Sequence, residues 1–202
     1  MTRKVPLTLL IIYIILFVVC AINPYDRAVW FAENLPIMLI VLILVLTYRR
    51  FQFSDTAYVL MSVLIFMHTI GGHYTFERVP AGFWLQDIFG FERNHYDRIA
   101  HFSVGFYAFA IAELCLAKQW IRSKAILFLF PIFAIFTVAA GYEIIEWWFA
   151  VLSDPEAGGA FLGSQGDIWD AQKDMLADGL GAIASMVLFW MMRKKEIDEK
   201  VK

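Results

Sequence analysis

Six apolar stretches, each close to the length of a membrane crossing, dominate this chain of 202 residues. They cover residues 6–22, 31–48, 56–74, 97–117, 125–149 and 174–192. An α-helix needs about 20 apolar residues to cross roughly 30 Å of hydrocarbon, and lipid offers the backbone no hydrogen-bond partners outside the helix itself. The chain is 60% hydrophobic, with a mean hydropathy of +0.63. We therefore expect an all-α, polytopic membrane bundle of about six transmembrane helices, folded as a single membrane domain over residues 1–202.

Lys and Arg residues are distributed unevenly between the loops at the two ends of these stretches. Of the 17 Lys and Arg residues, only five fall in the loops on the side away from the N-terminus: Arg27, Arg78, Arg93, Arg98 and Lys173. Loops rich in Lys and Arg stay in the cytoplasm. We therefore expect both termini to be cytoplasmic, with residues 193–202 as a cytoplasmic charged tail. The net charge of −2 and the lack of a basic patch argue against nucleic acid as a partner.

Two loops on the opposite, outer side are too long to be simple turns. Residues 75–96 mix large apolar and charged side chains, which is typical of an outer interfacial loop that contains a short helix lying on the membrane. Residues 153–173 form an outer acidic loop that contains several glycines, so its backbone can turn tightly. Membrane lipids are therefore the first expected partners.

All four histidines and many of the carboxylates lie at the predicted outer ends of the last four apolar stretches. His68 and His73 end the third, while His95, Asp97 and His101 open the fourth. Glu143 and Glu146 close the fifth, and the last is preceded and opened by Asp167, Asp170, Asp174 and Asp178. Ionisable groups at membrane depth are costly and usually functional. This convergence predicts one polar site at the outer face.

Asp178 should lie inside the membrane on length alone. Residues 179–192 comprise 14 uncharged positions, or ~21 Å of helix at ~1.5 Å per residue, whereas a crossing needs ~30 Å. The helix must therefore extend back through Asp178 toward Asp174. The small residues Ala177, Gly181 and Ser185 on another face of this helix allow a close helix contact.

Helical spacing groups the polar residues further. Asp97 and His101 are four apart, Glu143 and Glu146 are three apart, and His73 and Glu77 share a face if the third helix continues that far. Imidazole beside carboxylate serves both acid–base catalysis and metal binding. We expect catalytic roles for Asp97, His101, Asp174 and Asp178, and metal ligands at His73, Glu77, Glu143 and Glu146. The absence of cysteine from the set favours Zn, Mn or non-haem Fe.

Four segments of the chain carry a family resemblance: GHY at 72–74, HYDRIAHF at 95–102, YEIIEW at 142–147 and GDIWDAQKDMLAD at 166–178. On these segments the chain resembles the YjdF family of bacterial inner-membrane proteins, which implies a multi-pass protein of the bacterial inner membrane. A more distant resemblance links residues 97–102, Gln165 and residues 174–182 to VanZ-like membrane proteins. That family usually has Asn where this chain has Asp178. The resemblance adds Gln165 to the site, where Arg98 is the candidate to bind a substrate phosphate.

Three classes of function remain open. The first is a metal-assisted hydrolase or transferase acting on an envelope lipid or a lipid-linked precursor. The second is a non-catalytic membrane protein whose polar cluster is a structural or partner-docking clasp. The third, an ion-coupled transporter, is weaker because the acids cluster near one face and no inverted repeat is visible. The sequence does not specify the substrate, the metal or the oligomeric state.

Overall fold

The computed structural model describes residues 4–153 and 155–201, and within these ranges it contains helices and loops but no strand. The elements are α1 (Lys4–Cys20), α2 (Arg27–Thr47), α3 (Asp55–Tyr74), η1 (Phe76–Arg78), α4 (Pro80–Phe89), α5 (Tyr96–Val104), α6 (Tyr107–Ala117), α7 (Lys124–Leu152), α8 (Pro155–Leu162) and α9 (Asp170–Lys200). Five segments, with α5 and α6 taken as one, are long and apolar enough to span a membrane, and α1 is a shorter apolar helix of 17 residues. The expected all-α membrane bundle is confirmed.

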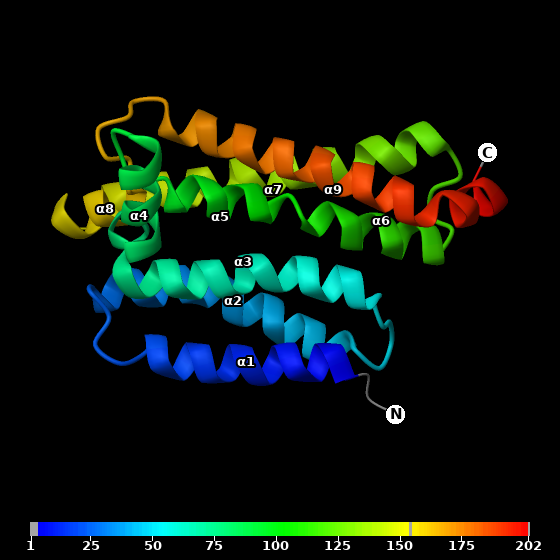
Figure 1. Ribbon diagram of the computed structural model, residues 1–202, viewed down its shortest axis with the longest axis horizontal. Coiled ribbons are helices and arrows are strands. Elements are labelled where there is room, and N and C mark those ends of the chain that lie inside the picture. Colours follow the sequence, from blue (N-terminus) through cyan, green and yellow to red (C-terminus); the bar gives the residue numbers. More distant parts are fainter. Residues whose placement is uncertain (1–3, 154, 202) are drawn as a thin grey trace.

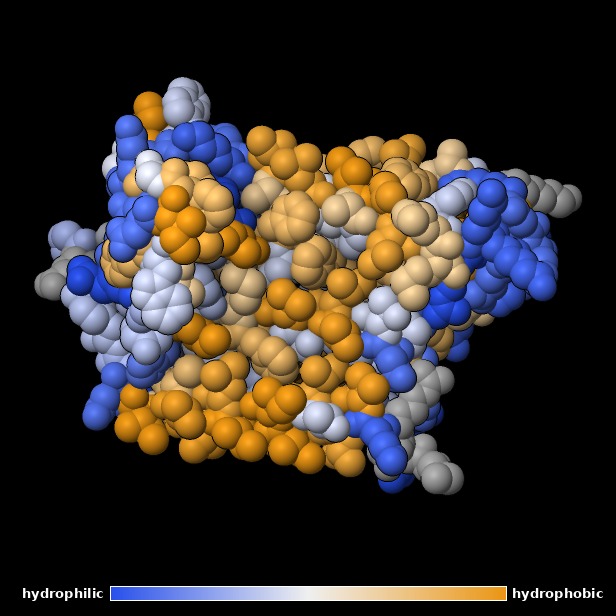
Figure 2. Space-filling view, in the orientation of Figure 1, coloured by the Kyte–Doolittle hydropathy of each residue, from blue (hydrophilic) through white to orange (hydrophobic). Residues whose placement is uncertain are grey.

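The helices run nearly parallel to one long axis (Figure 1). α1, α2 and α3 lie on one side, and α3 also packs against α5 and α6, which connect it to α7 and α9. The short helices α4 and α8 lie at one end of the bundle, and we call this the α4 end. α1 begins and α9 ends at the opposite end. Figure 2 shows a broad apolar belt between two hydrophilic ends, the surface expected of a helical bundle in a bilayer.

Small residues bring α5 and α9 into backbone contact. A Cβ on Gly181 would overlap the carbonyl oxygen of Phe102, and a Cβ on Gly105 would overlap the backbone of residues 181 and 182. The hydroxyl of Ser185 donates a hydrogen bond to the carbonyl oxygen of Gly105 at 3.0 Å. Lipid supplies little hydrophobic drive between helices, so such close packing carries the association. The small-residue face expected around Gly181 and Ser185 is therefore the face that meets α5.

Helix ends differ from the sequence prediction where side chains cap them. The second helix begins at Arg27 rather than near residue 31, because the Asp26 side chain accepts hydrogen bonds from the amides of Ala28 and Val29 at 2.7 and 2.9 Å. This earlier start carries Glu33 into the bundle, where it is 2% exposed. The last helix also begins earlier than residue 174, and it continues through most of the charged tail to Lys200.

The two long loops contain short helices. Residues 75–96 hold η1 and α4; α4 begins with Pro80 and ends at Gly90, whose φ of +69° suits glycine. Its Phe83, Trp84 and Ile88 side chains are exposed, as expected for an interfacial helix. Residues 153–173 hold α8 followed by a turn into α9. Both loops lie at the α4 end, beside the polar residues that the sequence groups together.

Candidate functional site

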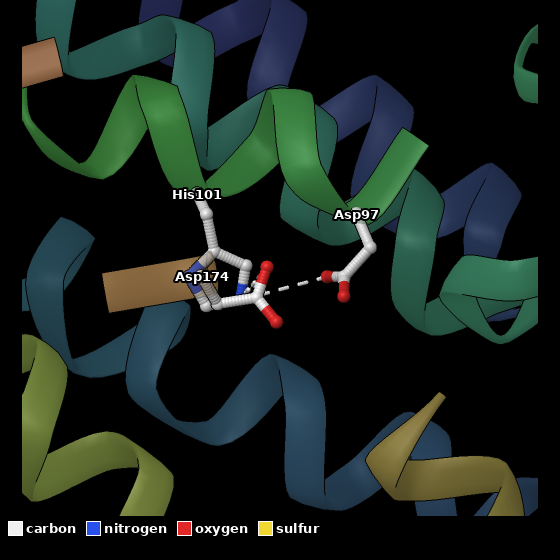
Figure 3. Close-up of side chains that lie close together, drawn as sticks. All are labelled: Asp97, His101 and Asp174. Atoms are coloured by element: carbon white, nitrogen blue, oxygen red, sulfur yellow. Dashed lines mark ion pairs between the residues drawn. The ribbon is translucent and has the colours of Figure 1, made fainter. Parts of the chain in front are cut away.

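His101 lies at the centre of a polar cluster between α5 and α9, near the α4 end. Its Nε2 atom is 3.6 Å from Asp97 Oδ1 and 3.8 Å from Asp174 Oδ1. Its Nδ1 atom is 3.3 Å from both carboxylate oxygens of Asp178. Figure 3 shows Asp97 and Asp174 with the imidazole, joined to it by the two ion pairs. One histidine therefore connects three carboxylates from two helices.

The helix pairing explains why these four side chains meet. Asp97 and His101 share a face of α5, and Asp174 and Asp178 share a face of α9, since each pair is four residues apart. The close crossing at Gly105 and Gly181 holds the two faces against each other. Asp174 and Asp178 are almost completely buried, at 3% and 1% exposed. The depth expected for Asp178 from helix length agrees with this burial.

Two arginines form ion pairs with carboxylates at the start of α9. Arg98 lies 2.5 Å from both Asp170 Oδ1 and Asp174 Oδ1, using a different Nη atom for each. Arg93 donates to Asp170 Oδ1 at 2.6 Å and to the carbonyl oxygens of Gly163 and Ser164 at 3.3 and 3.1 Å. Both guanidinium groups are thus committed to carboxylates. Arg98 is not free to bind a substrate phosphate without giving up these partners.

Two titratable groups in the loops at the α4 end, Asp167 and His95, have pKa values lowered by their surroundings. Lys173 Nζ lies 2.6 Å from Asp167 Oδ2, and this hydrogen bond lowers the pKa of the Asp167 carboxyl. Burial, helped by the nearby positive charges of Arg93 and Arg98, lowers the pKa of His95. At neutral pH the Asp167 carboxylate is therefore ionised and the His95 ring is neutral.

Gln165 joins the α8–α9 turn to the start of α5 through its side-chain amide. Its Oε1 accepts a hydrogen bond from the amide of Asn94 at 3.0 Å, and its Nε2 donates to the carbonyl oxygen of Asn94 at 2.9 Å. Asn94 is itself buried; its side chain donates to Val79 O and accepts from the amide of Tyr96. The Gln165 amide is thus used within the fold, as Arg98 is.

The geometry around His101 meets the basic requirement for a metal site. One ligand atom from each of Asp97, His101 and Asp174 lies within 4.8 Å of the others. Zn²⁺ bonds to imidazole nitrogen and carboxylate oxygen are ~2.0–2.2 Å long, so the three groups would draw together slightly around an ion. Nδ1 of the same ring faces Asp178, which matches the usual carboxylate behind a metal-bound histidine.

Two of the remaining predicted ligands, His73 and Glu77, have other partners. His73 Nδ1 lies 2.9 Å from the carbonyl oxygen of Cys20, and Glu77 pairs with Arg78 at 3.4 Å. α3 ends at Tyr74, so His73 and Glu77 do not share a continuous helix face. Glu143 has one buried carboxylate oxygen that finds no hydrogen-bond partner among the described residues, and Glu146 lines a small cavity together with Asp97 and His101.

This cavity has a volume of about 30 Å³, and its lining includes a second polar group besides Asp97 and His101. The second group consists of Glu33, His68 and Tyr142. A cavity of this size has room for a water molecule or a small ion. We did not expect Glu33 or Tyr142 at the site. A lone carboxylate within an apolar stretch was the available signal for Glu33.

Comparison with known proteins agrees with the family resemblance. Residues 5–195 match a family of predicted membrane proteins designated DUF2238. The chain is 34% identical over 191 residues to inner membrane protein YjdF of Escherichia coli (strain K12), and the match covers 92% of this chain and 86% of that protein. No solved structure matches significantly. The distant VanZ-like resemblance stays a prediction. With its membrane-length helices and this match, the chain is a multi-pass inner-membrane protein and belongs to the YjdF (DUF2238) family.

Proposed function

We propose that this protein binds a divalent cation between Asp97, His101 and Asp174 and catalyses a hydrolytic or group-transfer reaction on an envelope lipid or lipid-linked precursor. The observation that carries the proposal is the arrangement of His101. One ring nitrogen faces two carboxylates that can share an ion, and the other is held by the carboxylate of Asp178. Zn, Mn and Fe are the ions that suit this nitrogen and oxygen donor set.

The charge balance of the cluster also favours a cation. Asp97, Asp174 and Asp178 face His101 directly, and a protonated imidazole would neutralise only one of them. Arg98 is shared between Asp170 and Asp174. Uncompensated buried carboxylates are unfavourable. A divalent ion between Asp97 and Asp174 would supply the missing positive charge.

The chain's own residues divide the remaining tasks. Asp178 holds the Nδ1 proton of His101 and so presents Nε2 toward Asp97 and Asp174. A bound divalent ion supplies Lewis acidity and lowers the pKa of a coordinated water toward neutrality. Glu146 lines the cavity together with Asp97 and His101 and would be the candidate to accept a proton from such a water.

The position of the site favours a lipid headgroup as substrate. Exposed aromatic side chains surround the α4 end, including Trp84, Phe89, Trp147, Trp148 and Trp169. Tryptophan concentrates at the level of the headgroups. Because the cavity itself holds little more than a water, only the reacting group would approach it. The charge bias of the loops supports an outer position for this end of the bundle.

A structural clasp is the second candidate, and a specific contact favours it. Arg98 bridges Asp170 and Asp174, and Arg93 binds Asp170 and the carbonyl oxygens of residues 163 and 164. These contacts connect α5 to the α8–α9 turn without any ion. In that case the cluster stabilises the fold and the apo protein is the working form.

Metal analysis of protein purified in mild detergent separates the two candidates. After incubation with Zn²⁺ or Mn²⁺ and desalting, we expect about one ion per chain, since the part of the chain that the structure describes contains one three-ligand group. Asp97→Asn and Asp174→Asn should lose it. Glu113→Gln is the control, because Glu113 is a buried carboxylate whose two oxygens bind the amide and hydroxyl of Ser54 at 2.6 Å. A wild-type protein that keeps no ion would refute the metal proposal and leave the clasp.

The reaction class needs a separate measurement. Metal-loaded protein is mixed with vesicles of total bacterial inner-membrane lipid, and phosphorus NMR follows the headgroups. We expect a new phosphorus signal with the wild type and a strongly reduced one with Asp178→Asn, since removing an outer partner of a ligand typically lowers metal affinity or activity 10–100-fold. Unchanged lipid spectra, with metal bound, would refute the reaction on membrane phospholipid.

A further inference from the structure

Three side chains from three helices meet in the lining of the cavity beside His101. The hydroxyl of Tyr142 donates a hydrogen bond to Glu33 Oε2 at 3.0 Å, and its oxygen lies 3.4 Å from His68 Nε2. His68 Nδ1 lies 3.5 Å from the same Glu33 oxygen. Glu33 is 2% and His68 9% exposed. All three residues line the cavity, and the proposed metal chemistry assigns a task to none of them.

The hydrogen bonds among Glu33, His68 and Tyr142 require one proton more than an ionised Glu33 and a neutral His68 provide. Tyr142 has a single hydroxyl hydrogen, which it gives to Glu33, so the contact with His68 requires Nε2 to donate. A neutral His68 then has a bare lone pair at Nδ1. That atom is buried and, among the residues that the structure describes, has no hydrogen-bond partner. A lone pair facing an ionised carboxylate at 3.5 Å is repulsive. One proton held by either atom removes the conflict.

Among the residues that the structure describes, no hydrogen-bond donor reaches His68 Nδ1. The side-chain amide of Asn34 donates to Trp30 O, and the ring of Phe76 packs edge-on against His68 at 5.0 Å. The other charged or titratable groups lining the cavity are Asp97 and His101 from α5 and Glu146 from α7. The cavity is therefore lined both by two residues of the candidate metal centre and by a pair that requires a proton.

We infer that Glu33 and His68 hold one exchangeable proton, bridged by Tyr142, and deliver it across the cavity to the leaving group of the reaction. This inference rests on the proposed function for its final step. In a hydrolysis, the bond between the transferred group and the leaving oxygen breaks, and the proton of the pair goes to that oxygen. The attacking water joins the transferred group and gives its proton to Glu146, which lines the same cavity and returns the proton to the pair.

The proton can be observed without metal or substrate. If Glu33 holds the proton, infrared spectra in mild detergent at neutral pH should contain a protonated-carboxyl band that is lost in Glu33→Gln. If His68 holds it, nitrogen NMR of protein labelled with ¹⁵N-histidine should show a protonated imidazole for His68. His68→Gln assigns the latter signal among the four histidines. Finding Glu33 ionised and His68 neutral together would overturn the inference.

Access to the cavity is tested by exchange into D₂O. The band or signal should shift as soon as the buffer is exchanged, because the pair lines a cavity large enough for one water. A proton that resists exchange for hours would make the group structural and overturn the relay. Glu113→Gln is the matched control: its carboxylate already accepts two donors from Ser54, so the substitution should leave the band unchanged. Since metal content is measured separately, loss of metal binding and loss of the proton are distinguishable.

Discussion

The crossing of α5 and α9 gives the sharpest test of the fold, through Gly181→Ala. The added methyl group would overlap the carbonyl oxygen of Phe102 and lie 3.3 Å from the Cα of Gly105. Both obstacles are backbone atoms, so neither can rotate away, and the helices must separate. Overpacking of this kind costs about 1–3 kcal/mol. For a chain of this length we expect the apparent Tm to fall by roughly 2–12 °C, at about 2–4 °C per kcal/mol.

The chain offers a matched control in Gly141→Ala. Gly141 is also within a long helix, α7, and a Cβ there would meet nothing within 4 Å. The intrinsic helix preference of Ala makes this change neutral or stabilising by up to about 1 kcal/mol. Thermal unfolding of both variants is followed by circular dichroism in the same detergent. If Gly181→Ala unfolds at the temperature of Gly141→Ala, the two backbones do not touch and the close crossing is wrong.

The crossing also sets the geometry of the candidate site. His101 is four residues before Gly105, and Asp178 is three residues before Gly181, so separating the helices moves the imidazole away from its carboxylate partners. Metal binding in Gly181→Ala should therefore weaken by more than in Gly141→Ala. Unchanged metal content in a destabilised Gly181→Ala protein would show that the site tolerates this movement.

Three further predictions follow from burial, charge bias and hydrogen bonding. Asp178→Asn should keep near wild-type stability because it can still accept from the imidazole, whereas Asp178→Leu leaves a buried donor unpaired at a cost of ~1–3 kcal/mol in thermal unfolding; equal stability of the Leu variant would contradict the buried pair. Reporter fusions after Lys124 and after Gly90 should read cytoplasm and outside respectively, and the reverse result would invalidate the proposed orientation. Gln165→Ala should speed hydrogen exchange at the amide of Asn94, which Gln165 protects, and unchanged exchange would argue against that contact.

The sequence alone determined the architecture because the bilayer imposes a simple length rule. Apolar stretches near 20 residues can satisfy their backbone in lipid only as helices, and the observed helices overlap every predicted stretch. The same rule placed Asp178 inside the bundle, where it is 1% exposed. Helical spacing paired Asp97 with His101, since residues four apart share a face whatever the rest of the fold does.

Tertiary structure alone decided which of the predicted polar residues share one site. By spacing, His73 and Glu77 looked equivalent to Asp97 and His101. However, α3 ends at Tyr74, where Thr75 has a positive φ of 57°, so His73 and Glu77 do not lie on one helix. Which helix faces meet depends on packing between residues far apart in the chain, and periodicity within one helix carries no information about its neighbour. Glu33 lies near the start of an apolar stretch in the sequence, and only the packing of the helices encloses it beside the cavity. The sequence likewise predicted that Arg98 could bind a substrate phosphate, whereas in the fold two carboxylates of α9 form ion pairs with it.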